Sequence, residues 1–311
     1  MVAAVAQCCF HRYWLDVSVA YGGAIMIVVT GAAGQLGRRI VETLATIVDP
    51  HRIVVSVRDP DQVEGLADRG IRVRHGDFDE PASLSVAFED ADQVLIVSAN
   101  KLGEEARRLH RNAVEAARSA GAHRILYTSH MGACIGSPFA PADQHARTED
   151  DLANTGVPFT SLRHGFYAES CLLMVGDALR QGNLRVPEDG PVSWTTRADL
   201  ADADAAILAG PRSFEGVSPP LTSGQAITMA ELAVIASEVT GQEVRHTTVL
   251  DEEWRSAKIA AGMPEFYAEM LLGTFRAARH GDFAATSPVL GQLLGREPVA
   301  MREVLAQQLT L

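Results

Sequence analysis

Residues 26–45 read MIVVTGAAGQLGRRIVETLA and combine an apolar run, a glycine turn and a helical repeat. The run Met26–Val29 has no polar interruption, which is typical of a strand buried on both faces of a parallel sheet. After the turn, apolar residues recur at helical spacing from Leu36 to Ile47. A strand, a glycine turn and a helix in this order form the setting in which a glycine motif predicts a dinucleotide site.

The three glycines of this turn have different expected roles. Gly31 lets the backbone turn tightly, and Gly34 leaves room for a pyrophosphate over the helix N-terminus, whose N–H groups attract an anion. Gly37 lets the helix pack closely on the strand. The alternative is a glycine-rich turn in an α/β protein of another function. We expect a dinucleotide to contact the turn residues Gly31, Ala32, Ala33, Gly34, Gln35 and Leu36.

The composition excludes several classes of protein. The chain has 311 residues, 47% of them hydrophobic, and a net charge of −12, which argues against nucleic acid or anionic lipid as the main partner. The basic cluster 107–111 follows two glutamates, so we expect pairing within one solvated helix face. No apolar run reaches the length of a membrane span, and the cysteines and histidines have no metal-ligand spacing. We therefore expect a cytoplasmic protein without a metal site.

Residues 1–25 fit none of these patterns. The stretch lacks the basic start and continuous apolar middle of a signal peptide. Since Met26 begins the first strand, we expect residues 1–25 to be a loosely held, disordered extension or the product of an upstream start.

Further strands alternate with helices along the chain. Segments 53–57, 71–74, 93–98 and 124–128 predict four more strands, and the repeated order of strand and helix predicts a doubly wound parallel sheet, the Rossmann fold. We expect an NAD(P)-binding domain at 26–185 and a smaller C-terminal α/β substrate lobe at 186–311. Residues 216–223 would return to the sheet as its last strand, at an edge or broken, because Pro219 and Pro220 cannot donate ladder hydrogen bonds.

The residue after the second strand indicates the cofactor. An acid there would bind the 2′-hydroxyl of NAD, whereas an arginine accepts the 2′-phosphate of NADP. Arg58 occupies this place, and a guanidinium binds phosphate with two hydrogen bonds, so NADP is favoured. Because Asp59 follows directly, NAD remains possible as the cofactor. The alternative role of Arg58 is an ion pair with Asp59.

Two later strand ends should border the same ligand, because ligands of doubly wound sheets bind at the carboxyl ends of strands. Asp77 and Phe78 follow the third strand, where they resemble the acidic and aromatic residues that border the adenine in extended and atypical short-chain dehydrogenase folds; this resemblance implies the same role here. The alternative is a plain turn in which the aspartate caps the next helix. The loop Ser98, Ala99 and Asn100 follows the fourth strand and would pass under the nicotinamide-side ribose.

A typical short-chain dehydrogenase has a serine after the fifth strand and a Tyr–Lys pair on the next helix, where lysine lowers the tyrosine pKa for proton transfer. Ser129 is present, but His145 and Glu149 stand at the spacing of the pair, and no lysine lies between Lys101 and Lys258. A quinone needs less from the protein, because hydride transfer gives a stabilised hydroquinone anion and positioning carries most of the catalysis. His145 could assist as a proton donor. The alternative is a surface histidine paired with Glu149.

Several motifs resemble one family. TGAAGQLG at 30–37, YTS at 127–129, ADQH at 142–145, LRHGFYAES at 162–170 and SWTTRADL at 193–200 are similar to the NmrA-like atypical short-chain dehydrogenases, above all the bacterial NAD(P)H:quinone oxidoreductases and triphenylmethane reductases. The likeness extends from Met26 nearly to Leu311. It implies that the segment Arg163, His164, Gly165, Phe166 and Tyr167 lies beside the nicotinamide.

One position departs from the family pattern. His164 replaces the family's asparagine, and imidazole can donate and accept like an amide in only one tautomer, so nicotinamide orientation and substrate choice are in question. The motif of Thr195, Arg197 and Asp199 resembles the family's anchor of the second lobe, with helix capping by Thr195 or Thr196 as the alternative. Aromatic and apolar residues that would wall a pocket, or else belong to the core, are Phe139, Met174, Trp194, Phe266 and Tyr267.

We therefore expect an NADPH-dependent reductase that transfers hydride to a quinone or a similar electron-poor aromatic. His145 and Tyr167 are the candidate catalytic residues. The alternative is a non-catalytic NmrA-like regulator that senses NAD(P) and binds a partner protein. The sequence leaves open the natural acceptor and whether the chain forms a homodimer.

Overall fold

The computed structural model describes residues 15–16, 25–210 and 212–309. These residues form two compact units, each assembled from separate segments. The first unit comprises the described residues of Met1–Ser129, Arg147–Arg163 and Ala201–Pro219, and the second comprises those of His130–Ala146, His164–Leu200 and Pro220–Leu311. The division into lobes at 26–185 and 186–311 stays a prediction.

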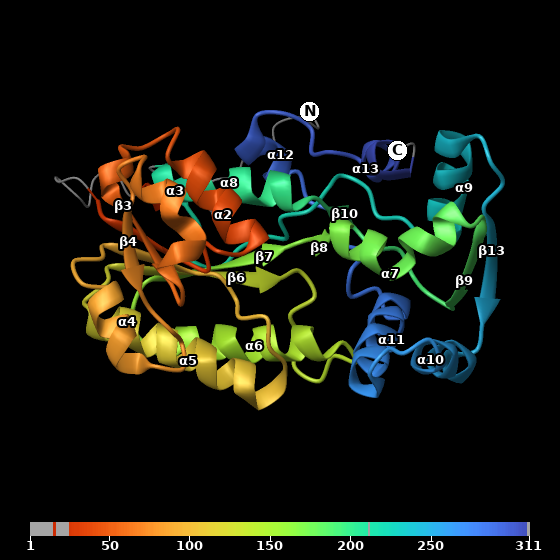
Figure 1. The fold of residues 1–311 in the computed structure, drawn as a ribbon, viewed down its shortest axis with the longest axis horizontal. Helices are drawn as coiled ribbons and strands as arrows, with labels where there is room; N and C mark the ends of the chain where they lie inside the picture. Colours follow the sequence, from red (N-terminus) through yellow and green to blue (C-terminus); the bar gives the residue numbers. More distant parts are fainter. Residues whose placement is uncertain (1–14, 17–24, 211, 310–311) are drawn as a thin grey trace, which may run out of the picture. The chain divides into compact units, whose positions relative to one another are not determined.

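A seven-stranded parallel sheet is the centre of the first unit, in the order β12-β7-β6-β5-β2-β3-β4 (Figure 1). Val28 on the central strand pairs with Val54 on one side and Val94 on the other. The order reverses between β2 and β5, as in the predicted Rossmann fold, which is thereby confirmed. The strands are β2 (Ile27–Thr30), β3 (Ile53–Val57), β4 (Arg72–His75), β5 (Gln93–Ile96), β6 (Arg124–His130), β7 (Phe159–His164) and β12 (Gly216–Val217).

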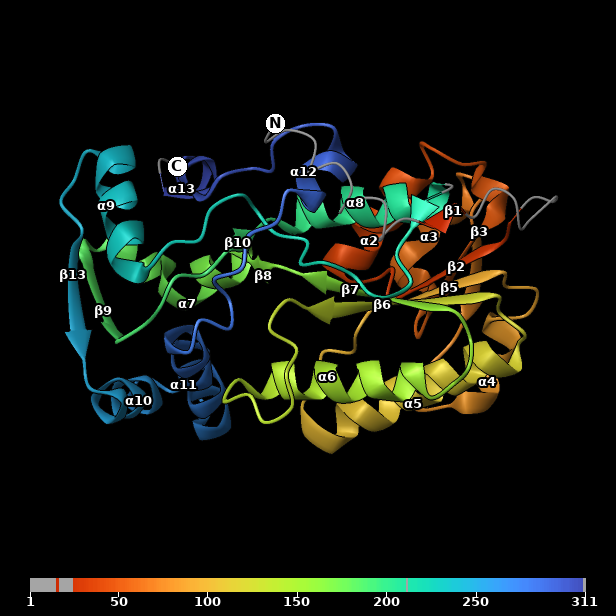
Figure 2. The same ribbon diagram turned by 180° about the vertical axis from the view of Figure 1, so that it is seen from behind.

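Helices cover both faces of this sheet (Figures 1 and 2). One face carries α2 (Gln35–Leu44), α3 (Glu64–Ala67) and the unit's part of α8 (Arg197–Ala209). The other face carries α4 (Pro81–Ala87), α5 (Gly103–Ser119) and the unit's part of α6 (Ala140–Ala153). Short 3-10 helices, η2 (Pro50–Arg52) and η3 (Pro60–Val63), flank β3. With both faces covered, every residue of β2 and β3 is buried, which explains their uninterrupted apolar sequences.

The last strand is shorter than predicted. Only Gly216–Val217 pairs with β7 as an edge strand, and a single further bridge joins His164 to Leu221. The strand ends before Pro219 and Pro220, as expected of residues without a ladder donor.

The prediction for residues 1–25 falls almost entirely outside the described residues. Within the described part, β1 (Leu15–Asp16) pairs antiparallel with β11 (Arg212–Ser213).

The basic cluster of α5 does not pair within its helix as predicted. Arg107 and Arg111 both bind Asp151 of α6, and Arg108 binds Asp79 at 2.6 Å. The hydrogen bond from Arg107 to Asp151 also raises the pKa of this guanidinium. The arginines of this cluster thus form their ion pairs with carboxylates outside α5 rather than with the glutamates of the same helix.

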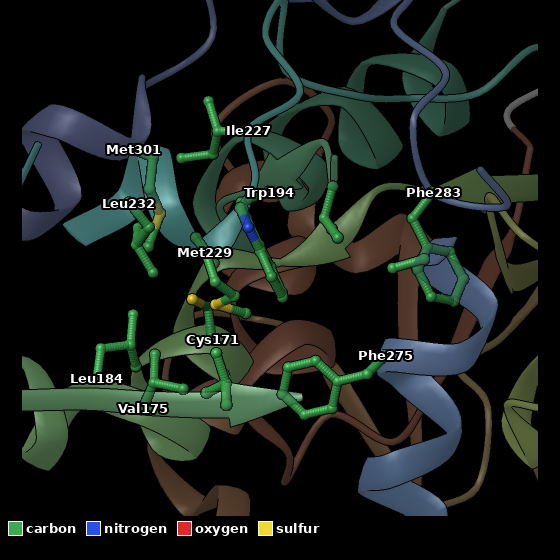
Figure 3. Packing of buried hydrophobic residues seen from close by; sticks show 14 of the residues in the cluster. Cys171, Val175, Leu184, Trp194, Ile227, Met229, Leu232, Phe275, Phe283 and Met301 are labelled. Carbon is green, nitrogen blue, oxygen red and sulfur yellow. The ribbon is translucent and has the colours of Figure 1, made fainter. Parts of the chain in front are cut away.

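The second unit has its own hydrophobic core (Figure 3). Trp194, Phe275 and Phe283 pack there with the buried Cys171. Its strands form two parallel pairs, β8 (Phe166–Tyr167) with β10 (Trp194–Thr195), and β9 (Asn183–Pro187) with β13 (Arg245–Val249). Its other helices are α7 (Ala168–Arg180), α9 (Met229–Thr240), α10 (Asp251–Ala260), α11 (Glu265–Arg279), α12 (Val289–Leu294) and α13 (Met301–Leu309).

Local signals in this unit act as the sequence suggests. Thr228 and Glu231 form a capping box at the start of α9, and Gly241 ends the helix in the left-handed conformation.

Candidate functional site

A cleft of about 730 Å³ opens in the first unit where β2, β3, β4 and β5 end. Its size lies within the ~300–1,000 Å³ typical of ligand sites. Its position matches the crevice at the switch point of a doubly wound sheet, where ligands of this fold bind. The predicted cofactor residues that line it are Gly31, Ala33, Gly34, Arg58, Asp77, Phe78, Ser98, Ala99 and Asn100.

The glycine turn has the geometry that close packing requires. Gly31 has φ +66°, a conformation that side chains disfavour, and a Cβ there would lie 3.2 Å from Val97. A Cβ at Gly37 would lie only 2.4 Å from the Gly31 carbonyl oxygen, so α2 can approach the turn only with glycine at this position. This agrees with the role expected of Gly37.

The start of α2 remains available for an anion. Gly34 is its N-cap residue in extended conformation, and no side chain caps the helix. N–H groups at an uncapped helix start, together with the helix dipole, favour a phosphate. Ala32 and Leu36 are buried, so only their main chain could meet a ligand, and Gln35 is exposed; contact of these three with a dinucleotide stays a prediction.

Arg58 lies on the cleft without a carboxylate partner among the described residues. Asp59, the expected alternative partner, instead begins η3, where it accepts hydrogen bonds from the Asp61 amide and from Gln62 Nε2. The guanidinium of Arg58 is therefore available to a ligand phosphate.

Asp77 and Phe78 form a turn that also lines the cleft. The Asp77 carboxylate accepts a hydrogen bond from the Asp79 amide, and the Asp77 amide donates to Ser83 Oγ. The Phe78 carbonyl accepts from Asn112 of α5. The aspartate thus stabilises its own turn, but it is not the helix cap that the alternative predicted, because Glu80 is the N-cap residue of α4 and no side chain caps that helix. Both Asp77 and Phe78 border the cleft.

Hydrogen bonds to the side chains of two threonines hold the loop after β5 in place. The Val97 amide donates to Thr30 Oγ1 and the Ser98 amide to Thr128 Oγ1, each at 2.9 Å. Both threonines are almost completely buried. This side of the cleft is consequently preorganised.

Other residues that line the cleft were not among the predicted NADP-binding residues. Most of them lie beside predicted positions at the same strand ends, whereas Gln62 lies in η3 and Leu109 in α5, where the sequence gives no signal of a site. They are Ser56, Val57, Gln62, Gly76, Asp79, Val97, Lys101 and Leu109, together with Asp59, which was considered only for NAD.

A buried carboxylate occupies the place of the missing lysine. Glu149 accepts hydrogen bonds from Ser129 Oγ at 2.7 Å and from Ser161 Oγ at 3.0 Å. Arg163 binds both of its oxygens, with Nη2 at 2.6 Å and Nε at 3.1 Å. Ser129 is thus engaged with a carboxylate and an ion pair rather than with a Tyr–Lys pair. Arg163, a predicted cofactor residue, lies in this cluster.

The next residues of the predicted nicotinamide segment belong to the second unit. His164 is buried, and its carbonyl accepts from the Met131 amide at 2.7 Å. A Cβ at Gly165 would lie 2.2 Å from Thr195 Oγ1, so this site requires glycine. The Arg197 guanidinium stacks on the Tyr167 ring, 4.4 Å from its centroid.

An aromatic group surrounds His130 in the second unit. Phe166, Phe139 and Phe283 pack around its ring, and His145 lies nearly parallel to it at a centroid distance of 6.2 Å. His145 is half-buried. The involvement of His145 and Tyr167 in catalysis stays a prediction.

The predicted pocket wall divides into core and surface residues. Phe139 and Trp194 are buried core residues, and Met174 packs against the same core. Phe266 and Tyr267 are instead exposed, and their rings pack on each other with centroids 4.4 Å apart.

The Thr-x-Arg-x-Asp motif serves local structure in the second unit. Thr196 caps α8 by accepting from the Asp199 amide, as one alternative foresaw, whereas Thr195 accepts from the Ser223 amide. Asp199 binds the Val299 amide at 2.8 Å and Arg296 at 2.7 Å.

In the part of the chain that the structure describes, no three His, Cys, Asp or Glu side chains gather as a metal site would require. Among the same residues, no helix has the length and apolar character needed to traverse a bilayer.

Comparisons with known proteins identify relatives of this chain. The chain is 34% identical to quinone oxidoreductase 2 of Escherichia coli over 279 residues, which cover 89% of this chain and 96% of the relative. The structure of E. coli NADPH-dependent quinone oxidoreductase QOR2 complexed with NADPH superposes with a TM-score of 0.85 at 33% identity, covering 91% of this chain and 99% of that one.

A second solved structure adds a different reductase. Triphenylmethane reductase from Citrobacter sp., complexed with NADP(H), has a TM-score of 0.83 at 33% identity, covering 92% of this chain and 100% of that one. The predicted cofactor is thus the one bound in both of these structures. Residues 24–303 match the NmrA-like family, and the chain belongs to this family.

Proposed function

We propose that this protein is an NADPH-dependent reductase that transfers hydride to a quinone or a similar electron-poor aromatic. The observation that carries the proposal is the cleft at the switch point, with an uncapped helix start and, on the same rim, Arg58, which has no carboxylate partner among the described residues. The two relatives with NADPH or NADP(H) support the cofactor, and their names support quinones and dyes as acceptors.

The residues present suit NADPH. Gly31 and Gly37 keep the turn compact, and the start of α2 would hold the pyrophosphate. Arg58 would bind the 2′-phosphate, which NAD lacks, so we propose a preference for NADP over NAD. When bound, NADPH would supply the hydride.

The protein's contribution to the chemical step would be mainly positioning. The only cation described beside Ser129 and Glu149 is Arg163, and its charge is neutralised by Glu149, so this cluster does not offer the free lysine that lowers a tyrosine pKa in a Tyr–Lys pair. An acceptor that is already electrophilic needs a hydride and one proton to become a hydroquinone. His145 and Tyr167 are the candidate donors of that proton, with water as the alternative donor.

NADPH oxidation in the presence of a benzoquinone tests the proposal. We expect the wild-type protein to oxidise NADPH, and we expect Arg58→Gln to do so more slowly at low NADPH concentration. With NADH as the cofactor, the rates of the wild-type protein and Arg58→Gln should differ less. Steady NADPH binding without oxidation of any quinone or dye in a panel would refute the reductase and favour the NAD(P)-sensing regulator.

The proton donor is tested by His145→Asn and Tyr167→Phe at saturating NADPH. If one of these residues donates the proton, its variant should have a lower kcat than the wild-type protein, and the size of this loss should depend on pH. Unchanged pH profiles in both variants would assign the proton to water.

A further inference from the structure

His110 is a buried histidine of α5. Its two ring nitrogens both have hydrogen-bond partners inside the protein, and one of these partners belongs to the loop after β5 that lines the cleft. Its side chain is 0% exposed. Its Nε2 accepts a hydrogen bond of 2.9 Å from the Ala99 amide. Ala99 lies in the loop that lines the cleft, so the ring connects α5 directly to that loop.

The hydrogen bonds define one tautomer of this ring. Because Nε2 accepts from an N–H, it carries no proton, and the proton of the neutral ring is on Nδ1. Nδ1 lies 3.1 Å from Thr148 Oγ1 and 3.3 Å from the Tyr127 hydroxyl. The ring therefore donates to a hydroxyl on one side while it accepts from the backbone on the other.

The surroundings keep the ring neutral. Burial lowers the pKa of His110 to about 4, against the opposing influence of Asp151. Asp151 is itself paired with Arg107 and Arg111. At neutral pH the acceptor on Nε2 is consequently always present.

We propose that His110 is a positioning residue for the cofactor: as the Nδ1–H tautomer it holds the Ala99 amide, and through it the loop Ser98–Asn100, in the conformation that the dinucleotide meets. This inference rests on the proposed NADPH site. Without the acceptor, the Ala99 N–H would be left unsatisfied in a partly buried place, and the loop would turn to find another partner.

Two isosteric variants separate positioning from packing. The side-chain amide of glutamine extends about as far as Nε2, and that of asparagine about as far as Nδ1. His110→Gln can therefore still accept from Ala99, whereas His110→Asn keeps only the group near Thr148. His110→Phe fills the volume without any acceptor.

We expect the Kd for NADPH to rise about tenfold in the Asn and Phe variants and to change less than about threefold in the Gln variant. The kcat at saturating NADPH and the KM of the acceptor should change less than the Kd. Thermal unfolding of all three variants identifies any that fail to fold, and the comparison of Gln with Asn stands without the Phe variant.

Nitrogen-15 NMR of the wild-type side chain provides a second, independent readout. A two-bond correlation spectrum should show protonated Nδ1 and unprotonated Nε2 for His110. A protonated Nε2 would overturn the inference, and so would equal NADPH affinities of folded Gln and Asn variants.

The two proposals fail in different ways. If the wild-type protein binds NADPH but the Gln and Asn variants bind it equally, the positioning role alone is wrong. If the wild-type protein does not bind NADPH, the proposed function is wrong and the positioning role falls with it, whatever tautomer the spectrum shows.

Discussion

Alanine at Gly37 should damage the dinucleotide site through a clash with the turn. A Cβ at this position would lie 2.4 Å from the Gly31 carbonyl oxygen and 2.7 Å from its carbon. Ordinary contact begins near 3.4 Å, so the turn and α2 must separate by about 1 Å, the difference between 3.4 and 2.4 Å. Both neighbouring atoms are backbone, which cannot rotate away as a flexible side chain would.

Two opposing effects determine the stability of this variant. Overpacking costs about 1–3 kcal/mol, whereas replacing glycine by alanine inside a helix gains up to about 1 kcal/mol. Because the clash is with backbone atoms, we expect a cost in the upper part of this range, about 2–3 kcal/mol, and after the gain of about 1 kcal/mol a net loss of about 1–2 kcal/mol in the free energy of unfolding. A shift of about 1 Å at a binding turn can cost on the order of a hundredfold in function, so the NADPH affinity should fall more steeply than the stability.

Gly65→Ala is the matched control. Gly65 also lies in a helix of the first unit, and a Cβ there would meet nothing within 4 Å. This variant should keep its NADPH affinity and gain up to about 1 kcal/mol. Urea unfolding and calorimetric titration with NADPH measure both quantities. If Gly37→Ala has the stability and NADPH affinity of Gly65→Ala, a Cβ at residue 37 does not disturb the turn.

Three further perturbations have defined outcomes. Arg58→Gln should weaken NADPH binding about tenfold or more and leave NADH binding unchanged; equal losses for both dinucleotides in titrations would contradict the 2′-phosphate role. Glu149→Gln should lower the free energy of unfolding by about 2 kcal/mol, less than the ~3–5 kcal/mol of a fully buried pair, because the Arg163 side chain is 28% exposed; urea unfolding at wild-type stability would contradict it. Because the pKa of His110 is lowered from 6.5 to about 4, the unfolded chain binds a proton that the folded chain does not, so stability should fall by about 3 kcal/mol as the pH falls from ~6.5 to ~4. His110→Phe should flatten that part of the stability–pH curve, and an unchanged curve would count against the buried neutral ring.

The sheet and its glycine turn were predictable because their determinants are local. Buried parallel strands need continuous apolar runs, and the requirement for glycine at Gly37 follows from the strand–turn–helix order. The edge position of β12 followed from Pro219 and Pro220 in the same way.

The supporting contacts of the site were not predictable, since they join residues far apart in the chain. His110 belongs to a basic cluster that suggests a solvated helix face, yet it is buried because Ala99, Tyr127 and Thr148 surround it. Glu149 likewise has its partners on other elements, at Ser129 and Arg163. Pattern along one helix carries no information about such partners.

Calorimetric titration of the wild-type protein with NADPH and, separately, with NADH tests most directly that the cleft of the first unit is a dinucleotide site. We predict that one NADPH binds per chain, more tightly than NADH, because the guanidinium of Arg58 has no carboxylate partner among the described residues and can bind the 2′-phosphate. If neither dinucleotide gives a heat of binding, the cleft is not a dinucleotide site.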